Sequence, residues 1–324
     1  MVLGLDPVTH LGHAAALFRR VVRNELSRFA LYFHFWQLLH SFPGIARCLS
    51  QAAKARAPIT QSTHARRKGK SILITCASTG IGAAAARAFA QYGANVVVHY
   101  QRRRVLLHYN SSKDQAEEVA QDMRALGVTA ITVGADVRDS KAIDAAVAQV
   151  VDSFGKIDVL INNAGSLVKR EPIASATDEL FDEIMHINAR SVVALTGAAL
   201  PSLRSGGGSI INVTSVAARN GGGPGALLYA ASKGFVSTIT KGMAKELMPD
   251  RIRVNAVAPG VTQTPFQERF RTPEQLESFR KSIPMGFIGE PDDCSGAFLY
   301  LASEAMSRYV TGQIIDVNGG QLMP

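Results

Sequence analysis

From residue 71 to the end of the chain, short apolar runs alternate with longer stretches in which apolar residues recur every three or four positions. The first run, residues 71–75 (SILIT), is almost wholly apolar, which is typical of a strand buried on both faces. An Ala-rich stretch at 81–91 follows a turn that contains glycines, and it is typical of a helix that ends at Gly93. This alternation predicts a parallel sheet with helices on both faces.

Seven strands and five helices are predicted in this part of the chain. The strands are 71–75, 95–100, 129–134, 157–161, 209–213, 252–257 and 314–317, and the helices are 81–91, 112–126, one that begins after Asp139, 178–203 and 228–247. Right-handed crossovers leave few topologies for such a series, and they favour the doubly wound sheet that binds dinucleotides. We therefore predict an α/β protein with a single Rossmann domain at 71–324. Its ligands are expected at the carboxyl ends of the strands.

Charge is distributed unevenly along the chain. Residues 1–70 contain eleven of the 35 Lys and Arg residues but only two of the 26 acidic residues, so the net charge of +9 belongs to this segment. The remaining residues have 24 basic and 24 acidic side chains and are neutral overall. A neutral main domain argues against nucleic-acid binding there, and a small-molecule substrate is expected instead.

The first 70 residues are predicted to be an extension and linker outside the main domain. Residues 13–39 have a loosely helical apolar pattern with Arg residues mostly on another face. This is typical of a mitochondrial presequence, of a helix lying on a membrane surface, or of an extension without fixed structure in the mature protein. Residues 50–70 are polar and basic, which indicates a linker. No run of 18 apolar residues exists, so no transmembrane span is predicted.

The cysteines bear on the cellular compartment. Cys48, Cys76 and Cys294 are far apart in the sequence and odd in number, so neither a disulfide framework nor a metal site is predicted. A reducing compartment is the simplest interpretation. We expect a cytoplasmic protein, or a mitochondrial one if residues 1–50 act as a presequence.

A turn containing two glycines lies between the first strand and its helix. In residues 75–82 (TCASTGIG), Gly80 and Gly82 would let the backbone approach a pyrophosphate at the positive end of the helix. Glycines at such a turn also serve simple packing. The position directly after the first strand favours the binding interpretation.

Tyr229 and Lys233 are the strongest candidates for chemistry. They lie four residues apart on a predicted helix, so both side chains project from one face. A phenol with an ordinary pKa near 10 is not a base at neutral pH, but a nearby ammonium lowers that pKa. The pattern YxxxK is a frequent chance match. Here it follows a strand that leads to Ser215, whose hydroxyl would stabilise charge on a substrate oxygen.

Two further stretches contain asparagine. Residues 162–165 (NNAG) follow the fourth strand and either line a cofactor groove or form a simple turn. Asn188 lies inside the long predicted helix, where Asn is a poor helix former. It is either an exposed helix position or an amide with a task near the site.

With these residues in place, the chain resembles the short-chain dehydrogenase/reductase family over about residues 71 to 320. Its branches of β-ketoacyl-carrier-protein reductases and sugar-alcohol dehydrogenases are similar through residues 284–291 and 312–320. The family's catalytic Asn, Ser, Tyr and Lys resemble Asn188, Ser215, Tyr229 and Lys233. The resemblance also implies a set of cofactor contacts. They are Thr75, Ser78, Gly80, Ile81, Gly82, Asp136, Val137, Asn163, Ala164, Gly165, Tyr229, Lys233, Pro259, Gly260 and Thr262.

The resemblance implies an NAD(P)-dependent enzyme that interconverts a ketone and a secondary alcohol. Tyr229 would protonate the carbonyl oxygen as hydride arrives, while Ser215 orients the carbonyl. Lys233 would hold the ribose and tune Tyr229, and Asn188 would support a water linking Lys233 to solvent. A homodimer or homotetramer is also implied, joined through the helices near 178–203 and 228–247. The competing hypothesis is a catalytically weak nucleotide-binding sensor or scaffold.

The sequence departs from the family in two places. Cys76 stands where the family has its first glycine, so a positive φ there would be strained and cofactor binding weakened. Cys76 is also the one feature that favours the sensor hypothesis. Deleting residues 101–109 would restore an unbroken family sequence, which indicates an inserted segment or an error at an exon boundary.

Cofactor choice depends on the same region. The second strand does not end in the acid that favours NAD. Residues 102–104 (RRR) are either placed to pair with a 2′-phosphate or are a solvated charge run. We expect NADP(H), with NAD(H) as the alternative.

Substrate contacts are expected from residues 263–288, which form a predicted lid of loop and helix. Its large apolar side chains are Phe266, Phe270, Phe279, Met285 and Phe287. They either contact substrate or pack within the lid, and they predict a substrate with apolar parts.

Overall fold

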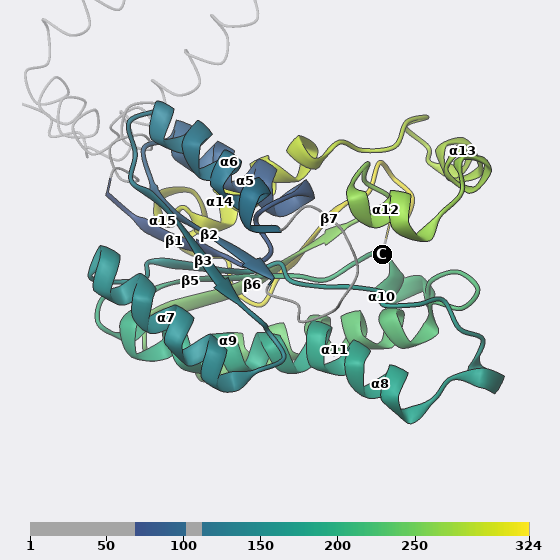
Figure 1. Ribbon diagram of the computed structural model, residues 1–324, viewed down its shortest axis with the longest axis horizontal. Coiled ribbons are helices and arrows are strands. Elements are labelled where there is room, and N and C mark those ends of the chain that lie inside the picture. Colours follow the sequence, from purple (N-terminus) through teal and green to yellow (C-terminus); the bar gives the residue numbers. More distant parts are fainter. Residues whose placement is uncertain (1–68, 102–111, 324) are drawn as a thin grey trace, which may run out of the picture. The chain divides into compact units, whose positions relative to one another are not determined.

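The computed structural model describes residues 69–101 and 112–323. All seven predicted strands are present in one parallel sheet with the order β3-β2-β1-β4-β5-β6-β7, so the predicted Rossmann fold is confirmed (Figure 1). The strands are β1 (Ser71–Ile74), β2 (Asn95–Gln101), β3 (Ala130–Ala135), β4 (Val159–Asn162), β5 (Gly208–Val213), β6 (Ile252–Pro259) and β7 (Ile314–Val317). Residues 1–68 of the predicted extension and residues 102–109 of the predicted insertion lie outside the described residues.

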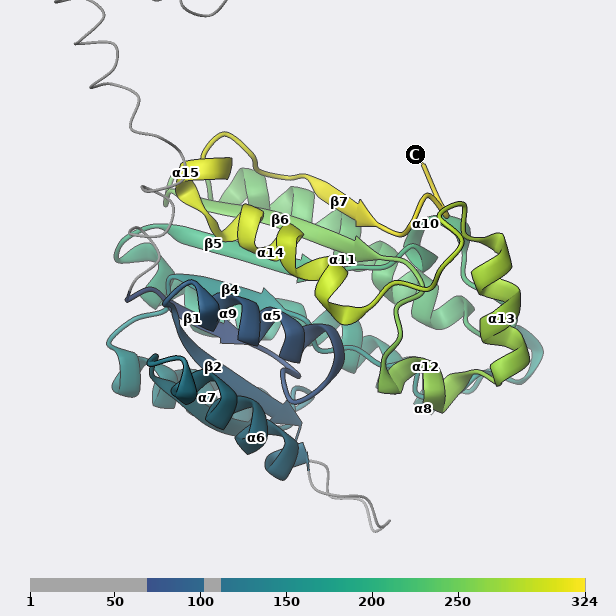
Figure 2. The same cartoon turned by 90° about the horizontal axis from the view of Figure 1, so that it is seen from above.

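Helices cover both faces of the sheet, as the mostly buried and mainly apolar strands predict. One face carries α5 (Gly80–Gln91), α6 (Ser112–Ala125) and α14 (Ser295–Ala302), and the other carries α7 (Ser140–Phe154), α9 (Ser191–Arg204) and α11 (Leu227–Glu246) (Figures 1 and 2). The sheet therefore separates two apolar cores.

Large side chains fill each core. Phe89, Met123 and Phe298 are almost completely buried on the first face. Leu160 and Leu203 are fully buried on the second. Each such side chain contributes about 1.5–3 kcal/mol relative to an exposed one, so these two layers hold the sheet and its carboxyl-end loops in place.

The long helix predicted at 178–203 is interrupted. It consists of α8 (Asp178–Met185), a π-helical turn η2 (His186–Arg190) and α9. Asn188 lies in the π-helical turn, and its Nδ2 donates to the carbonyl oxygen of Ile184 at 2.9 Å. A π turn inside a helix often marks a functional position.

Besides α14, several short elements could not be given bounds from the sequence, because each is too brief to show a period; of these, only the lid of loop and helix at 263–288 was expected. They are η1 (Ile173–Ser175), α10 (Ala217–Asn220), α12 (Pro265–Phe270), α13 (Pro273–Ser282), η3 (Pro291–Cys294) and α15 (Glu304–Ser307). Helices α12 and α13 make up the predicted lid, and Thr272 with Gln275 forms a capping box at the start of α13. Figure 2 shows both helices at the end of the sheet where the strands have their carboxyl ends.

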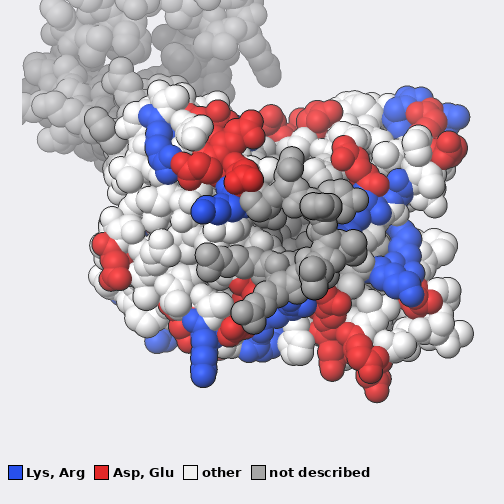
Figure 3. Space-filling view, in the orientation of Figure 1, with Lys and Arg blue, Asp and Glu red and all other residues white. Residues whose placement is uncertain are grey.

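The surface of the described residues carries both signs of charge. Neither Lys and Arg nor Asp and Glu dominate the face drawn in Figure 3, as the neutral charge of residues 71–324 predicts. None of the helices described here has the length and hydropathy that crossing a membrane demands.

Candidate active site

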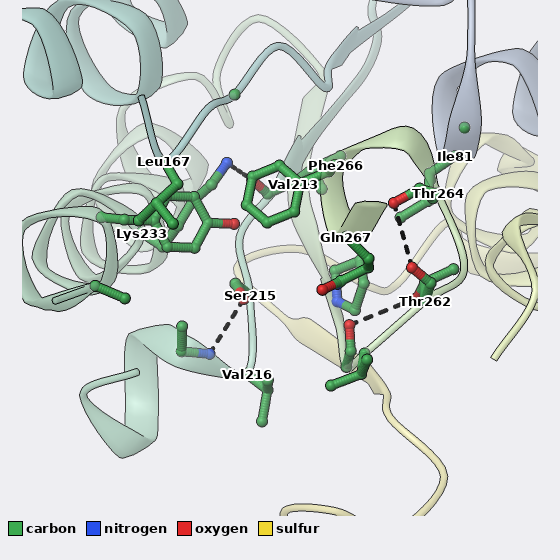
Figure 4. Close-up of a pocket in the computed structure, with 18 of the residues that line it drawn as sticks. Ile81, Leu167, Val213, Ser215, Val216, Lys233, Thr262, Thr264, Phe266 and Gln267 are labelled. Atoms are coloured by element: carbon green, nitrogen blue, oxygen red, sulfur yellow. Dashed lines mark hydrogen bonds between the residues drawn. The ribbon is translucent and has the colours of Figure 1, made fainter. Parts of the chain in front are cut away.

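A pocket of about 240 Å³ opens at the carboxyl ends of the central strands, beneath α12. It brings together many residues that the sequence predicted. Those that line it are Gly80, Ile81, Asn163, Gly165, Ser215, Tyr229, Lys233, Pro259, Gly260 and Thr262. Figure 4 shows Lys233 and Phe266 approaching this space from α11 and from the lid.

The other predicted residues lie around the pocket and not on its wall. Thr75, Gly82, Ala164 and Asn188 pack behind the lining residues, as the contacts below show. Ser78, Asp136 and Val137 are not among the described residues that line the pocket.

The turn after β1 has the form of a phosphate cradle. Helix α5 begins at Gly80, and Thr79 before it makes no side-chain hydrogen bond to the first-turn N–H groups of this described helix. Those N–H groups point toward the pocket end of the helix and are available to an anion. Gly80 has φ +55°, and a Cβ there would meet Thr264 at 3.2 Å. The residues therefore fit the pyrophosphate of a dinucleotide.

Close packing fixes the same turn from behind. A Cβ on Gly82 would lie 2.5 Å from the Cys76 carbonyl oxygen and 2.6 Å from the Asn163 Nδ2. Asn163 Nδ2 donates to the carbonyl oxygens of Thr75 and Cys76 at 2.9 and 3.1 Å. The Thr75 hydroxyl accepts from the Asn163 and Ala164 N–H groups, both at 2.9 Å. Thr75 and Asn163 thus join the turn after β1 to the loop after β4.

Cys76 adopts the backbone conformation that its glycine-like position predicts. Its φ is +49°, in the left-handed region that favours glycine. Its N–H donates to His99 Nδ1 at 3.2 Å, and burial lowers the pKa of His99 to about 4, so this imidazole is neutral and can accept. Cys76 is one of the residues that line the pocket.

Replacing Cys76 by Gly is expected to raise the free energy of unfolding by about 1 kcal/mol, because the left-handed conformation is strained for a residue with a Cβ. It should also lower the Kd for reduced dinucleotide by about fivefold, because Cβ and sulfur leave the pocket wall. Chemical denaturation and fluorescence titration measure the two effects. Cys76→Ala removes only the sulfur, so comparing it with Cys76→Gly separates the effect of the sulfur on stability and Kd from the effect of the Cβ. An unchanged or higher Kd in Cys76→Gly would remove this explanation.

Lys233 is buried at the centre of the site. It is 3% exposed, and its Nζ donates to the Val213 carbonyl oxygen at 2.8 Å (Figure 4). Burial lowers the pKa of Lys233 to about 8, with Cys76 acting in the opposite direction. Lys233 thus has one hydrogen bond to a backbone oxygen and a pKa not far above physiological pH. Such a side chain can exchange both its hydrogen-bond partner and its proton.

Tyr229 lies one helical turn before Lys233 on α11 and is half-buried. Burial raises the pKa of Tyr229 to about 12, against a hydrogen bond with Ser215 and the positive charge of Arg271. Lys233 Nζ lies 5.9 Å from the centre of the phenol ring. The sequence led us to expect that Lys233 lowers the Tyr229 pKa. In this structure it does not, because its ammonium bonds to Val213 and burial outweighs the neighbouring charges.

Asn188 holds the loop after β4 against this pair. Its Oδ1 accepts from the Ser166 N–H at 3.0 Å, and its Nδ2 donates to the Ser166 carbonyl oxygen at 2.8 Å. A Cβ on Gly165 would lie 2.9 Å from both Asn188 Oδ1 and Lys233 Nζ, so the three residues converge. Asn188 is fully buried, which excludes the alternative of an exposed helix position.

Asp136 lies at the end of β3 and is engaged within the protein. Burial acts to raise the pKa of this carboxyl, but hydrogen bonds from Arg138 and Gln101 outweigh it and hold the pKa below its usual range. Gln101 Nε2 donates to Asp136 Oδ1 at 2.7 Å, and Arg138 Nη2 donates to Oδ2 at 2.6 Å. Its contact with adenine stays a prediction.

Sequence reasoning did not single out Arg170, Gln267 or Arg271 among the residues that line the pocket, although the last two lie within the predicted lid at 263–288. Arg170 lies in an aperiodic loop, and the other two lie on the short lid elements, so no pattern marked them. Gln267 is 6% exposed, and its Oε1 is buried without a hydrogen-bond partner in the described part of the chain. Of the predicted lid side chains, Phe266 lines the pocket, and its ring lies 5.6 Å from that of Tyr229.

Comparisons with known proteins cover most of the chain. A family model described as Enoyl-(Acyl carrier protein) reductase matches residues 76–321. The 3-oxoacyl-(acyl-carrier-protein) reductase FabG of Thermotoga maritima is 37% identical over 257 residues, which are 79% of this chain and 98% of that protein.

Solved structures are similar over the same part of the chain. The NADH-dependent reductase A1-R′ responsible for alginate metabolism is 37% identical, with a TM-score of 0.70 over 80% of this chain and 99% of its own. A 7α-hydroxysteroid dehydrogenase complexed with NADH and 7-oxo glycochenodeoxycholic acid is 32% identical, with a TM-score of 0.73 over 80% of this chain and 96% of its own.

Proposed function

The chain belongs to the short-chain dehydrogenase/reductase family of NAD(P)-dependent oxidoreductases, and from that premise we propose that it transfers hydride between NADP(H) and a ketone or secondary alcohol, with Tyr229 as acid and base. The observation that carries the proposal is the meeting of Tyr229, Ser215 and Lys233 in one pocket that ends at the phosphate turn.

Each residue has a task that its surroundings support. Tyr229, whose pKa is about 12 here, is protonated at neutral pH and can donate to the carbonyl oxygen of a substrate. The Ser215 hydroxyl acts to lower the Tyr229 pKa, and it can donate to that oxygen as negative charge develops on it. The bound nicotinamide supplies the hydride. In the oxidative direction the same groups take the proton back.

Lys233 and Asn188 support the proton transfer. Lys233 has three donors, and its single bond to Val213 leaves the others for ribose hydroxyls. Its ammonium would then lie nearer the phenol and favour the phenolate that remains after proton transfer. Asn188 fixes the loop that holds Gly165 against Lys233 Nζ. We propose Asn188 as the support of the proton path from Lys233.

NADP(H) is the proposed cofactor because the end of β2 carries no acid to repel a 2′-phosphate. The described strand ends in His99, Tyr100 and Gln101, and the nearby Asp136 carboxylate is paired with Arg138. The ratio of kcat/KM for NADPH to that for NADH, measured with a panel of carbonyl substrates, is expected to exceed about 10, the value of one charge-assisted contact. A preference for NADH would refute the cofactor proposal, and oxidation of neither dinucleotide would refute the reaction.

A homodimer or homotetramer is proposed through α8, α9 and α11. These helices expose Phe181, Val193 and Phe235, which are 48%, 44% and 38% accessible. Apolar side chains on adjacent helices are suited to an interface between copies.

A further inference from the structure

The charged side chains of the pocket all have the same sign. Among the described residues that line it, Arg170, Lys233 and Arg271 are charged, and all three are cations, without an Asp or Glu to balance them. The proposed mechanism uses only Lys233. Arg170 and Arg271 have no carboxylate within ion-pair distance in the parts of the chain that the structure describes. A half-buried pair of guanidinium groups without a carboxylate partner favours binding of an anion.

Arg271 lines the same pocket as Tyr229 and is stacked on an aromatic ring. Its guanidinium carbon lies 4.0 Å from the centre of the Phe279 ring, and its Nε is buried without a hydrogen-bond partner among the described residues. Burial lowers the pKa of Arg271 to about 10, Arg170 lowers it further, and Tyr229 acts in the opposite direction. An unpaired donor in a half-buried cation is unusual in a folded protein, and a ligand oxygen would satisfy it.

Arg170 is fixed beside it by the backbone. Its Nε donates to the carbonyl oxygen of Phe270 at 3.1 Å, and its Nη1 donates to that of Pro224 at 2.7 Å. Phe270 immediately precedes Arg271, so this bond places Arg170 at the base of Arg271. Two of its five N–H donors are used in this way, and the rest of the fork is available.

The cationic pair is separate from the phosphate cradle. Helix α12 has Thr264 at its start, against Gly80 of the phosphate turn, and Arg271 directly after its end. Six helical residues span about 9 Å, so the backbone of Arg271 is separated from the phosphate turn by the length of α12, and its charge acts on Tyr229.

We propose that the substrate is an oxo acid, or the corresponding hydroxy acid, whose carboxylate binds Arg170 and Arg271 while its carbonyl oxygen faces Tyr229. This inference rests on the proposed function and names the substrate class of the same site. The carbonyl carbon gains hydride from the reduced nicotinamide, and the carbonyl oxygen gains the Tyr229 proton. The carboxylate is unchanged and serves to hold and orient the substrate. The rings of Phe266 and Tyr229 pack on each other and give the pocket an apolar wall beside the carbonyl site.

The test compares small oxo acids with their methyl esters, which keep the ketone and remove the charge. With saturating NADPH, kcat/KM for the acids should exceed that for the esters by about 10- to 100-fold, the value of hydrogen bonds to a charged group. Arg271→Gln should abolish this preference by raising KM for the acids, whereas any change through the Tyr229 pKa should alter kcat for acids and esters alike. Arg271→Lys, which keeps the charge, should restore part of the preference.

The matched control is Arg269→Gln. Arg269 is an exposed arginine near the same end of α12, and its guanidinium lies over the ring of Phe270. This variant should leave kcat/KM unchanged for the acids and for the esters. Esters reduced as well as acids, or an equal loss for both in Arg271→Gln, would overturn the inference while the reaction itself stands. A preference for a phosphorylated ketone over the matching oxo acid would overturn the carboxylate assignment. A folded protein that binds NADPH but reduces no carbonyl would instead contradict the proposed function.

Discussion

Tyr229→Phe is expected to lower kcat for carbonyl reduction by about 10²- to 10⁴-fold, the usual contribution of a positioned general acid. The phenol is the half-buried hydroxyl that Ser215 and Arg271 both act on, and the variant removes only its oxygen. Phe266 packs on the ring at 5.6 Å, and a phenylalanine keeps that contact. Dinucleotide affinity and melting temperature should therefore change little. Steady-state rates measure the loss of kcat, and fluorescence titration on the same sample measures the dinucleotide affinity.

The control for this variant is Tyr309→Phe, which removes a phenol that is 100% exposed and lies near β7. It should have wild-type rates. If Tyr229→Phe retained most of its activity, the proton would come from another group. If it lost activity together with dinucleotide binding, the phenol would serve the structure of the pocket and not the chemistry.

Lys233→Met is expected to have the second-largest effect, because it removes a buried ammonium that no other described cation replaces beside Val213. We expect kcat/KM to fall by about 10²- to 10³-fold, combining lost hydrogen bonds to ribose with a less stable phenolate. Unlike Tyr229→Phe, this variant should also raise the Kd for the dinucleotide. Lys245→Met, on the exposed surface of the same helix, is the control and should bind normally.

The pH dependence of binding gives Lys233 a signature of its own. Because burial lowers its pKa to about 8, the side chain is protonated below that pH and loses its charge above it. The ammonium form is the one that donates to the dinucleotide, so affinity should be highest below about pH 8 and should fall as the pH rises further. Lys233→Met should have weak affinity without this inflection. An inflection of the same size in the variant would assign it to another group.

The sheet was predictable because each strand is an apolar run bounded by turns, and such runs have no alternative to burial between helices. Likewise, Tyr229 and Lys233 share a helix, and helical spacing alone places them on one face. Ser215 follows the end of a strand, and the carboxyl ends of the strands in such a sheet lie at the ligand site.

Other features depend on contacts that sequence spacing does not encode. The ammonium of Lys233 bonds to Val213 and not toward Tyr229, and this follows from the backbone approach of β5 to α11. Asn188 lies in a π turn that interrupts a helix. The role of this turn follows from the hydrogen bonds between the Asn188 side chain and the Ser166 backbone. Arg170 and Arg271 lie about 100 residues apart in aperiodic segments, and the bond between Arg170 and the Phe270 carbonyl is what brings them together.

The most direct test of the account is a single turnover with reduced dinucleotide that carries deuterium in its transferable position. We predict that the protein binds it saturably and that the alcohol product contains one deuterium at the former carbonyl carbon, with the hydroxyl proton drawn from solvent. Saturable binding without deuterium in any product, for oxo acids and neutral ketones alike, would contradict the claim that Tyr229 and Lys233 form a working acid–base pair beside the nicotinamide.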